Sequence, residues 1–188
     1  MGERHAAAIV LAGGRGRRLG GVDKPALRIG VRTLLGIALT AAAGAPAVVV
    51  GPERDLPTGV RVVREDPPGS GPAAAIAAGL AALPELTDHD LVVILAADLP
   101  AIDAATVRHL CAGVGERNGA VLVDAGGRRQ WLAGVWRHWP LVDAVRRRTD
   151  WSGRSVRELL GPLEPVELTG HEAATADVDT PDDWQRLR

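Results

Sequence analysis

The sequence predicts an α/β protein with a mostly parallel sheet, and three observations lead to this prediction. Short runs of Val, Ile, Leu and Ala alternate with helical patterns along the 188 residues, as expected where crossover helices join parallel strands. Hydrophobic residues make up 46% of the chain and charged residues 24%, a balance typical of globular proteins. No repeat, low-complexity tract or long linker interrupts the pattern. We therefore expect one domain over residues 1–188, long enough to bury a substantial core.

The first half of the chain alternates strands with helices. Ala6–Leu11 is the first predicted strand, and the loop Ala12–Lys24 follows it. Asp90–Ala96 is rich in Leu, Val and Ile, which is typical of a central strand buried on both faces. Between them we expect strands at Ala47–Val50 and Val60–Val63, and helices over about Thr33–Ala43 and Pro72–Leu83. Proline is favoured in a first helical turn, which supports the start at Pro72.

The second half has weaker periodicity but clear helix signals. Asp103 is expected to cap a helix that ends near Ala112. Ser155 and Glu158 have the spacing of a capping box, and Thr180 before Pro181 indicates a final helix. The remaining predicted elements are strands at Ala120–Asp124, Gln130–Trp136 and Val166–Leu168, and a helix at Pro140–Arg148.

Three glycines and four cations gather just after the first strand. Glycines allow close backbone approach to a ligand, and successive backbone N–H groups in such a loop form an anion-binding concavity. Guanidinium groups match phosphate oxygens in pairs. The glycines are Gly13, Gly14 and Gly16, and the cations are Arg15, Arg17, Arg18 and Lys24. This many cations favours a triphosphate ligand.

Two other phosphate-binding loops do not fit this segment. A P-loop needs a lysine followed by Ser or Thr, whereas Lys24 is followed by Pro25. A dinucleotide site needs an acidic residue about twenty positions after its glycines to bind the ribose. The nearest candidate, Glu53, lies well beyond that spacing.

Two carboxylates are placed where a nucleotide site would use them. Asp98 directly follows the buried strand, and Mg²⁺ prefers one or two carboxylates together with phosphate oxygens. Taken alone, an aspartate before Leu-Pro is equally typical of a turn. Asp66 and the turn Gly69–Gly71 precede a helix whose N-terminus would face a nucleotide, although a plain loop before a packing helix has the same pattern.

Four segments in order resemble the molybdenum cofactor guanylyltransferases, within the wider group of MobA-like nucleotidyltransferases. They are LAGGRGRRLGGVDKPAL, EDPPGSGPAAAIAAG, LAADLP and DVDTPDDW, and the similarity spans Val10 to Trp184. The Gly-Val-Asp-Lys ending of the first segment favours the molybdenum cofactor branch. The resemblance implies a Rossmann-like three-layer α/β/α sandwich with a mostly parallel sheet, of the nucleotide-diphospho-sugar transferase type. It also implies that GMP passes from GTP to the phosphate of molybdopterin, with Mg²⁺ as cofactor and release of pyrophosphate.

The motif residues and the resemblance together define the expected site. Leu11, Ala12 and Gly13 would contact the nucleotide, and Asp66 would lie on its base or ribose side. The expected catalytic residues are Arg18, Lys24 and Asp98; the nucleotide-binding residues are Leu11, Ala12, Gly13, Gly14, Arg15, Lys24, Asp66 and Asp98; and the metal ligands are Asp98, Asp177 and Asp179.

Two positions depart from the pattern of this branch. Asp177 and Asp179 stand where it often has asparagines, and we expect at least one of them to reach the metal. The segment VVVGPER lacks an asparagine that often contributes to nucleotide binding after the second strand. Both departures bear on the substrate rather than on the class of reaction.

The composition narrows the partners and the compartment. A net charge of −1 does not favour a nucleic-acid partner. The longest apolar run, Leu91–Ala97, is too short to span a bilayer, and no secretory signal is visible. Cys111 is the single cysteine, which excludes an internal disulfide and favours a reducing compartment. We expect a cytoplasmic protein that, by the resemblance, contacts other proteins of molybdenum cofactor biosynthesis.

Other functions stay open at this point. The same chemistry would serve a cytidylyl- or guanylyltransferase acting on another small phosphorylated acceptor. A nucleotide-binding regulator without catalytic activity and an NAD(P)-dependent reductase are alternatives of other classes. Trp136, His138 and Trp139 are candidates for lining a pocket for a flat pterin.

Overall fold

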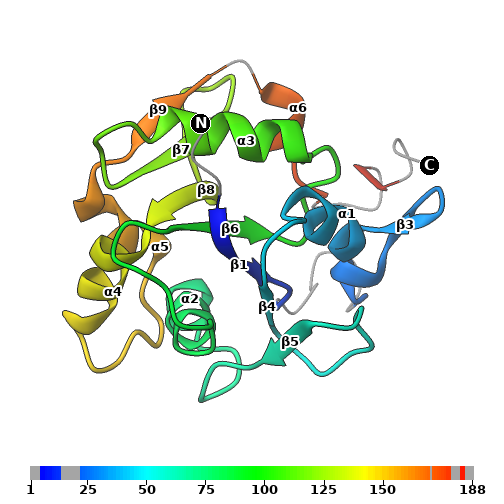
Figure 1. Ribbon diagram of the computed structural model, residues 1–188. Coiled ribbons are helices and arrows are strands. Elements are labelled where there is room, and N and C mark those ends of the chain that lie inside the picture. The colour runs from blue at the N-terminus through cyan, green and yellow to red at the C-terminus, as the bar shows by residue number, and fades with distance from the viewer. Residues whose placement is uncertain (1–4, 14–21, 170, 179–182, 185–188) are drawn as a thin grey trace.

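A computed structural model describes residues 5–13, 22–169, 171–178 and 183–184, and it is built around a seven-stranded sheet (Figure 1). The strands lie in the order β5-β4-β1-β6-β8-β7-β9. Their bounds are β1 (His5–Leu11), β4 (Ala47–Val50), β5 (Val60–Val63), β6 (Leu91–Ala96), β7 (Gly119–Val123), β8 (Arg129–Arg137) and β9 (Val166–Leu168). These bounds agree closely with the predicted strands, because each strand coincides with a run of apolar or β-branched residues.

The sheet is parallel except for β8. β1 pairs in parallel with β4 and β6, and β4 pairs in parallel with β5. β8 runs antiparallel to both β6 and β7, whereas β7 and β9 are parallel. In the centre, Val10 lies opposite Val49 of β4 and Leu95 of β6. β8 is reversed because the short segment after β7 forms a hairpin, whereas parallel neighbours need a longer crossover.

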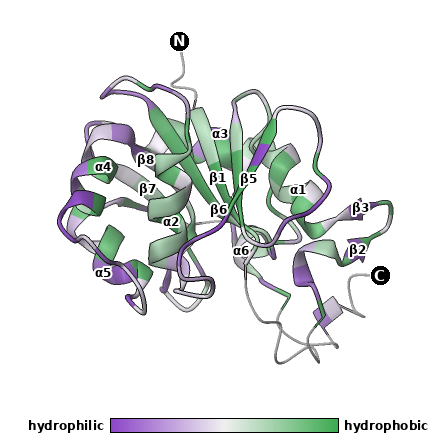
Figure 2. Ribbon diagram, turned by 90° about the horizontal axis from the view of Figure 1, so that it is seen from below, coloured by the Kyte–Doolittle hydropathy of each residue, from purple (hydrophilic) through white to green (hydrophobic). Residues whose placement is uncertain are grey.

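Helices cover both faces of this sheet and complete three layers (Figure 1). On one face lie α1 (Leu34–Ala41), α3 (Ala104–Gly113) and α6 (Glu172–Thr175); on the other lie α2 (Pro72–Ala81), α4 (His138–Arg146) and α5 (Val156–Leu160). Successive β1 residues divide between the two cores: Val10 packs in the core of α1 and α3, and Ile9 in the core of α2 and α5. Figure 2 shows hydrophobic residues concentrated along the central strands. The predicted three-layer α/β/α sandwich is confirmed.

Two predicted helix caps are present. The Asp103 carboxylate accepts a hydrogen bond from the Thr106 amide at 2.7 Å, and this bond is the main cause that lowers the pKa of Asp103. Ser155 and Glu158 form a full capping box at the start of α5. Both caps satisfy backbone donors that a helix start leaves without intrahelical partners.

The short elements escaped prediction. They are the 3-10 helices η2 (Lys24–Ala26) and η3 (Gly161–Leu163), the hairpin of β2 (Arg28–Ile29) and β3 (Arg32–Thr33), and α6. None is long enough to show a hydrophobic period. The predicted final helix lies largely outside the described residues. Its two described residues, Asp183 and Trp184, are helical. Within the described part of the chain, no helix has the length and apolar character to cross a membrane.

Candidate functional site

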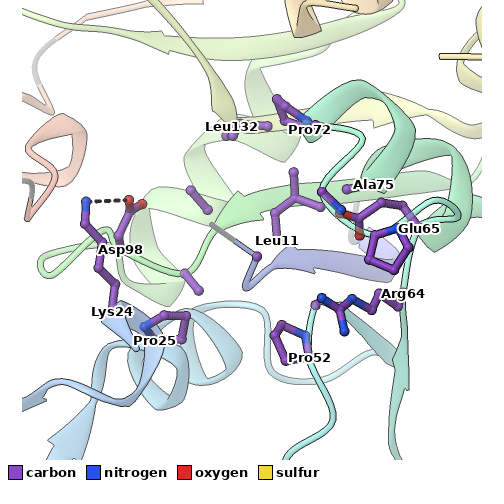
Figure 3. Close-up of a pocket in the computed structure, with 17 residues that line it drawn as sticks. Leu11, Lys24, Pro25, Pro52, Arg64, Glu65, Pro72, Ala75, Asp98 and Leu132 are labelled. Atoms are coloured by element: carbon purple, nitrogen blue, oxygen red, sulfur yellow. Dashed lines mark hydrogen bonds and ion pairs between the residues drawn. The ribbon is translucent and has the colours of Figure 1, made fainter. Parts of the chain in front are cut away.

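A cavity of about 470 Å³ opens at the carboxyl ends of the parallel strands (Figure 3). Each of four strands contributes a lining residue at or just after its end: Leu11 from β1, Gly51 from β4, Arg64 from β5 and Ala96 from β6. Open α/β sheets bind ligands at this edge, and the volume is in the range of small-molecule sites. The cavity is therefore the candidate functional site.

The end of β1 forms the floor of the cavity. Leu11 and Gly13 line it, while Ala12 between them is buried. The Ala12 amide donates to the Val50 carbonyl at 2.8 Å, and the Ala97 amide donates to the Leu11 carbonyl at 2.9 Å. These bonds continue the sheet ladder past the strand ends. The backbone of two predicted nucleotide-contact residues, Leu11 and Ala12, is thus hydrogen-bonded to the neighbouring chain segments, and the third, Gly13, follows directly.

Glycine is required at position 51 because two strand ends meet there. A Cβ atom on Gly51 would lie 2.8 Å from the Ala12 carbonyl oxygen and 2.9 Å from its carbon. Such contacts are with backbone, which has little room to move. A side chain at position 51 would therefore displace the floor of the cavity.

Lys24 and Asp98 face each other at one end of the cavity (Figure 3). Lys24 begins η2, and Asp98 follows β6. The Lys24 Nζ atom lies 3.7 Å from Asp98 Oδ2, and the two side chains are 17% and 29% exposed. Two residues that are 74 positions apart in the sequence are thus brought together at the predicted phosphate and metal position. The lysine balances the charge of the carboxylate in a partly enclosed setting.

The C-terminal segment packs beside Asp98. The Val178 amide donates to the Asp98 carbonyl at 3.2 Å, and the Val178 side chain is fully buried. Asp177, next to it, is exposed. Val178, and Asp177 next to it, therefore lie beside the Asp98 loop, as expected if this segment contributes to the same site.

Arg64 and Glu65 occupy the other end of the cavity (Figure 3). One Glu65 carboxylate oxygen accepts a hydrogen bond from the Gly69 amide at 2.9 Å, which fixes the loop before α2. Asp66, the predicted base or ribose contact, is exposed and is not among the described residues that line the cavity. The bond to the Gly69 amide holds the Glu65 side chain at the cavity, whereas Asp66 lies in the bend that follows and stays exposed.

Helix α2 begins at the cavity wall. Gly71, at φ 99°, is its N-cap, and Gly71 and Pro72 both line the cavity. The first turn of this ten-residue helix carries partial positive charge and free amide donors. The loop before α2 is tied to a later segment, since the Gly153 amide donates to the Ser70 carbonyl at 2.8 Å.

Several predicted residues lie outside the described part of the chain. They are Gly14, Arg15, Gly16, Arg17, Arg18 and Asp179, and their roles remain predictions. Among the residues that the structure describes, no group of three or more His, Cys, Asp or Glu side chains could hold a metal by itself. A single carboxylate at Asp98 nevertheless fits Mg²⁺ if a nucleotide supplies phosphate oxygens, because Mg²⁺ is commonly held in that way.

The structure adds residues that sequence reasoning missed. Arg54, from the loop after β4, contacts both Ala12 and Asp23, and Leu132 of β8 lines the cavity. No sequence pattern pointed to Arg54, because its partners Asp23 and Ala12 are 31 and 42 positions away in the chain. Leu132 lies beside a register shift between β7 and β8, where Val121 pairs with Gly134 and Leu122 with Gln130. Bulges of this kind redirect side chains.

The hypothesis of a pterin pocket at Trp136, His138 and Trp139 is wrong. Trp136 is completely buried, and the His138 amide donates to the Asp90 carbonyl, just before β6 begins. Because β8 is antiparallel to β6, its last residues lie at the amino ends of the parallel strands. The three side chains therefore lie at the edge of the sheet opposite the cavity.

Comparison with known proteins agrees with the observed fold. The profile of the MobA-like NTP transferase domain matches residues 8–166. The chain belongs to this family.

Individual relatives point to one branch of the family. The chain is 30% identical to the molybdenum cofactor guanylyltransferase of Rhizobium johnstonii, over 97% of this chain and 91% of that protein. It is 31% identical to a probable molybdenum cofactor guanylyltransferase of Mycobacterium avium, over 96% and 94% of the two chains.

Solved structures show the same fold in proteins of different substrate. The molybdopterin-guanine dinucleotide biosynthesis protein A of Archaeoglobus fulgidus superimposes with a TM-score of 0.72 at 20% identity, covering 96% of each chain. The 2-C-methyl-D-erythritol 4-phosphate cytidylyltransferase of Thermus thermophilus gives a TM-score of 0.71 at 19% identity, covering 97% of each chain. The fold is thus common to guanylyl- and cytidylyl-type proteins.

Proposed function

We propose that this protein transfers GMP from GTP to the phosphate of molybdopterin carrying molybdenum and releases pyrophosphate. One observation carries the proposal: Lys24 and Asp98 of the family motifs meet in a cavity at the carboxyl edge of the sheet. The names of the relatives that match over nearly the whole chain support GTP and molybdopterin as the substrates.

In the proposed reaction an oxygen of the acceptor phosphate forms a bond to the α-phosphorus of GTP. The bond between the α-phosphorus and the bridging oxygen to the β-phosphate breaks, and pyrophosphate leaves with that electron pair. An acceptor phosphate is already ionised near neutral pH, so the step needs no general base. Catalysis then depends on alignment and on stabilising negative charge.

The described residues supply both requirements. Lys24 would bind the phosphates and neutralise charge that develops around the α-phosphorus. Leu11 and Gly13 would hold the nucleotide against the sheet edge, and the N-terminus of α2 would add backbone donors. Asp98 would hold Mg²⁺, which when bound supplies positive charge to the nucleotide phosphates.

Further roles are proposed from the sequence motifs and the family. Arg18 is proposed to act with Lys24, and Arg15 and Arg17 are proposed to hold the outer phosphates, by the cationic motif alone. Asp177 and Asp179 are proposed as further metal ligands, on the position of Val178 beside Asp98. Contacts with other proteins of molybdenum cofactor biosynthesis and a cytoplasmic location are proposed from the family.

One assay tests the proposal. Purified protein is incubated with Mg²⁺, molybdopterin and each nucleoside triphosphate in turn, and pyrophosphate and dinucleotide product are measured. GTP should give both products at the highest rate. Product formation with CTP in place of GTP would move the protein to the cytidylyl branch, and nucleotide binding without pyrophosphate release would make it a regulator.

A further inference from the structure

Arg54 lies behind the cavity wall and makes four polar contacts. Its guanidinium donates to the Ala12 carbonyl at 3.3 Å and to the two carboxylate oxygens of Asp23 at 3.3 and 3.4 Å. Its Nε atom donates to the Pro52 carbonyl at 3.2 Å. The side chain is only 13% exposed, although the Asp23 side chain is 56% exposed.

The residues that Arg54 contacts are sequence neighbours of residues that line the cavity. Ala12 directly precedes Gly13, and Asp23 directly precedes Lys24; Gly13, Lys24 and Pro52 all line the cavity. Arg54 therefore contacts Ala12 at the start and Asp23 at the end of the glycine-rich motif, and each of them directly precedes a residue that lines the cavity. A planar guanidinium can hold several oxygens in a fixed geometry, which a lysine cannot do.

We infer that Arg54 is a positioning residue for the triphosphate: by joining Ala12 to Asp23 it fixes Gly13 and Lys24 before the nucleotide arrives. Holding these groups in advance reduces the ordering cost of binding. The inference also explains the Asp in the Gly-Val-Asp-Lys motif, since Asp23 binds Arg54 while Lys24 faces the cavity. It rests on the proposed function in one respect, that the ligand is a nucleoside triphosphate.

Structural stability has other sources at this point of the fold. The Ala12 amide is bonded to Val50, and the β1–β4 ladder continues through four residue pairs. An ion pair with a mostly exposed carboxylate contributes little to folding. Removal of Arg54 should therefore weaken nucleotide binding more than it weakens the fold.

The experiment measures the binding of each nucleoside triphosphate with Mg²⁺ by titration calorimetry. Losing hydrogen bonds to charged groups should raise the Kd of Arg54→Ala for the nucleotide that the wild type prefers by about 10- to 100-fold. Arg54→Lys and Asp23→Asn should lie between this variant and the wild type. In steady-state assays, KM should rise while kcat stays within about threefold, since Arg54 does not touch the reacting atoms.

Arg117→Ala is the matched control. Arg117 also binds one backbone carbonyl and one carboxylate, both of Glu164, at 2.9 and 3.4 Å. These contacts lie near β9, away from the cavity, so Kd should not change. Millimolar guanidinium added to Arg54→Ala should recover part of the lost affinity and leave the control unaffected.

A second measurement does not depend on nucleotide. The Ala26 and Leu27 amides donate to the carbonyls of Asp23 and Lys24 at 3.0 and 2.9 Å. Amide exchange at both should accelerate in Arg54→Ala. Slow exchange, or a Kd within twofold of wild type at an unchanged Tm, would overturn the inference. If Arg54→Ala does not fold, the two conservative variants decide by the same criteria. A wild type that prefers another triphosphate would refute the GTP assignment while leaving the role of Arg54 testable with that triphosphate.

Discussion

At the residue scale, the cavity places a positive and a negative side chain, Lys24 and Asp98, next to each other. Lys24 Nζ lies 3.7 Å from Asp98 Oδ2, so a cation suited to phosphate oxygens and a carboxylate suited to a metal ion lie side by side. The pair is thus complementary in charge to a magnesium nucleotide: the lysine matches the phosphates and the carboxylate matches the metal ion. The chemistry proposed here depends on these two side chains more than on any others that the structure describes.

Lys24→Ala should reduce turnover far more than it reduces stability. Loss of one charge-stabilising donor typically costs on the order of 10²–10³ in rate, whereas Lys24 is at the cavity wall and not in the core. Initial rates and thermal unfolding of the same preparation provide the measurement. Arg32→Ala on β3, which removes an exposed cation outside the cavity, is the control. Near wild-type turnover in a folded Lys24→Ala protein would remove this residue from the mechanism.

Asp98→Asn should abolish Mg²⁺-dependent turnover, while Asp179→Asn should weaken metal affinity and keep measurable activity. A carboxylate at Asp98 would be the main protein ligand, and a second carboxylate adds charge that tightens the ion. The check is a Mg²⁺ titration of initial rate, paired with calorimetric binding of Mg²⁺ in the presence of GTP. An unchanged Mg²⁺ midpoint in Asp98→Asn would contradict the metal assignment.

Among the larger elements, α2 is the helix that couples packing to the site. Its N-terminal residues line the cavity, while Gly79 near its other end packs against the sheet. A Cβ on Gly79 would lie 2.6 Å from a methyl of Ile9 and 2.9 Å from a methyl of Val50. The helix can approach the sheet this closely only because position 79 has no side chain.

Gly79→Ala should therefore destabilise the protein even though alanine is the better helix former. The gain in propensity is about 1 kcal/mol, against roughly 1–3 kcal/mol for overpacking a core. Urea unfolding should show a net loss, and the affinity for nucleotide should fall because the first turn of α2 shifts. Ala78→Gly, in the same helix, measures the propensity term separately. A more stable Gly79→Ala protein would show that the sheet yields without cost.

For the molecule as a whole, ligand binding and folding are coupled through the sheet. The cavity takes residues at or just after the ends of β1, β4, β5 and β6, so a bound nucleotide would contact four strands of the sheet at once. Any ligand that binds the folded state alone stabilises it by mass action.

Mg²⁺-GTP should raise the thermal midpoint more than Mg²⁺-CTP or Mg²⁺-ATP at equal concentration. At one hundred times Kd the stabilisation is about 2.7 kcal/mol, or roughly 5–10 °C for a domain of this size. Differential scanning fluorimetry with each nucleotide gives the ranking. A larger shift with CTP than with GTP would contradict the assignment of the base, and equal small shifts would point to binding of phosphates alone.

Local patterns in the sequence determined the strands, the main helices and their caps. Apolar runs decide strands such as Leu91–Ala96 through local sterics and burial, and Ser155 with Glu158 specifies a cap within one turn. The sequence also predicted that Lys24 and Asp98 lie close together, because loops that follow parallel strands meet at one edge of a sheet, and the structure places both in one cavity.

Tertiary structure alone decided which side chains meet. The Arg54–Asp23 pair spans 31 positions, and no periodic pattern encodes such a contact. Whether Glu65 or Asp66 lines the cavity depends on the bend that the chain makes after β5. The direction of β8 placed Trp136 far from the site and brought Leu132 to it. A sequence pattern reports burial and local backbone preference, whereas side-chain partners are fixed by strand order, strand direction and register, which arise only when distant segments pack.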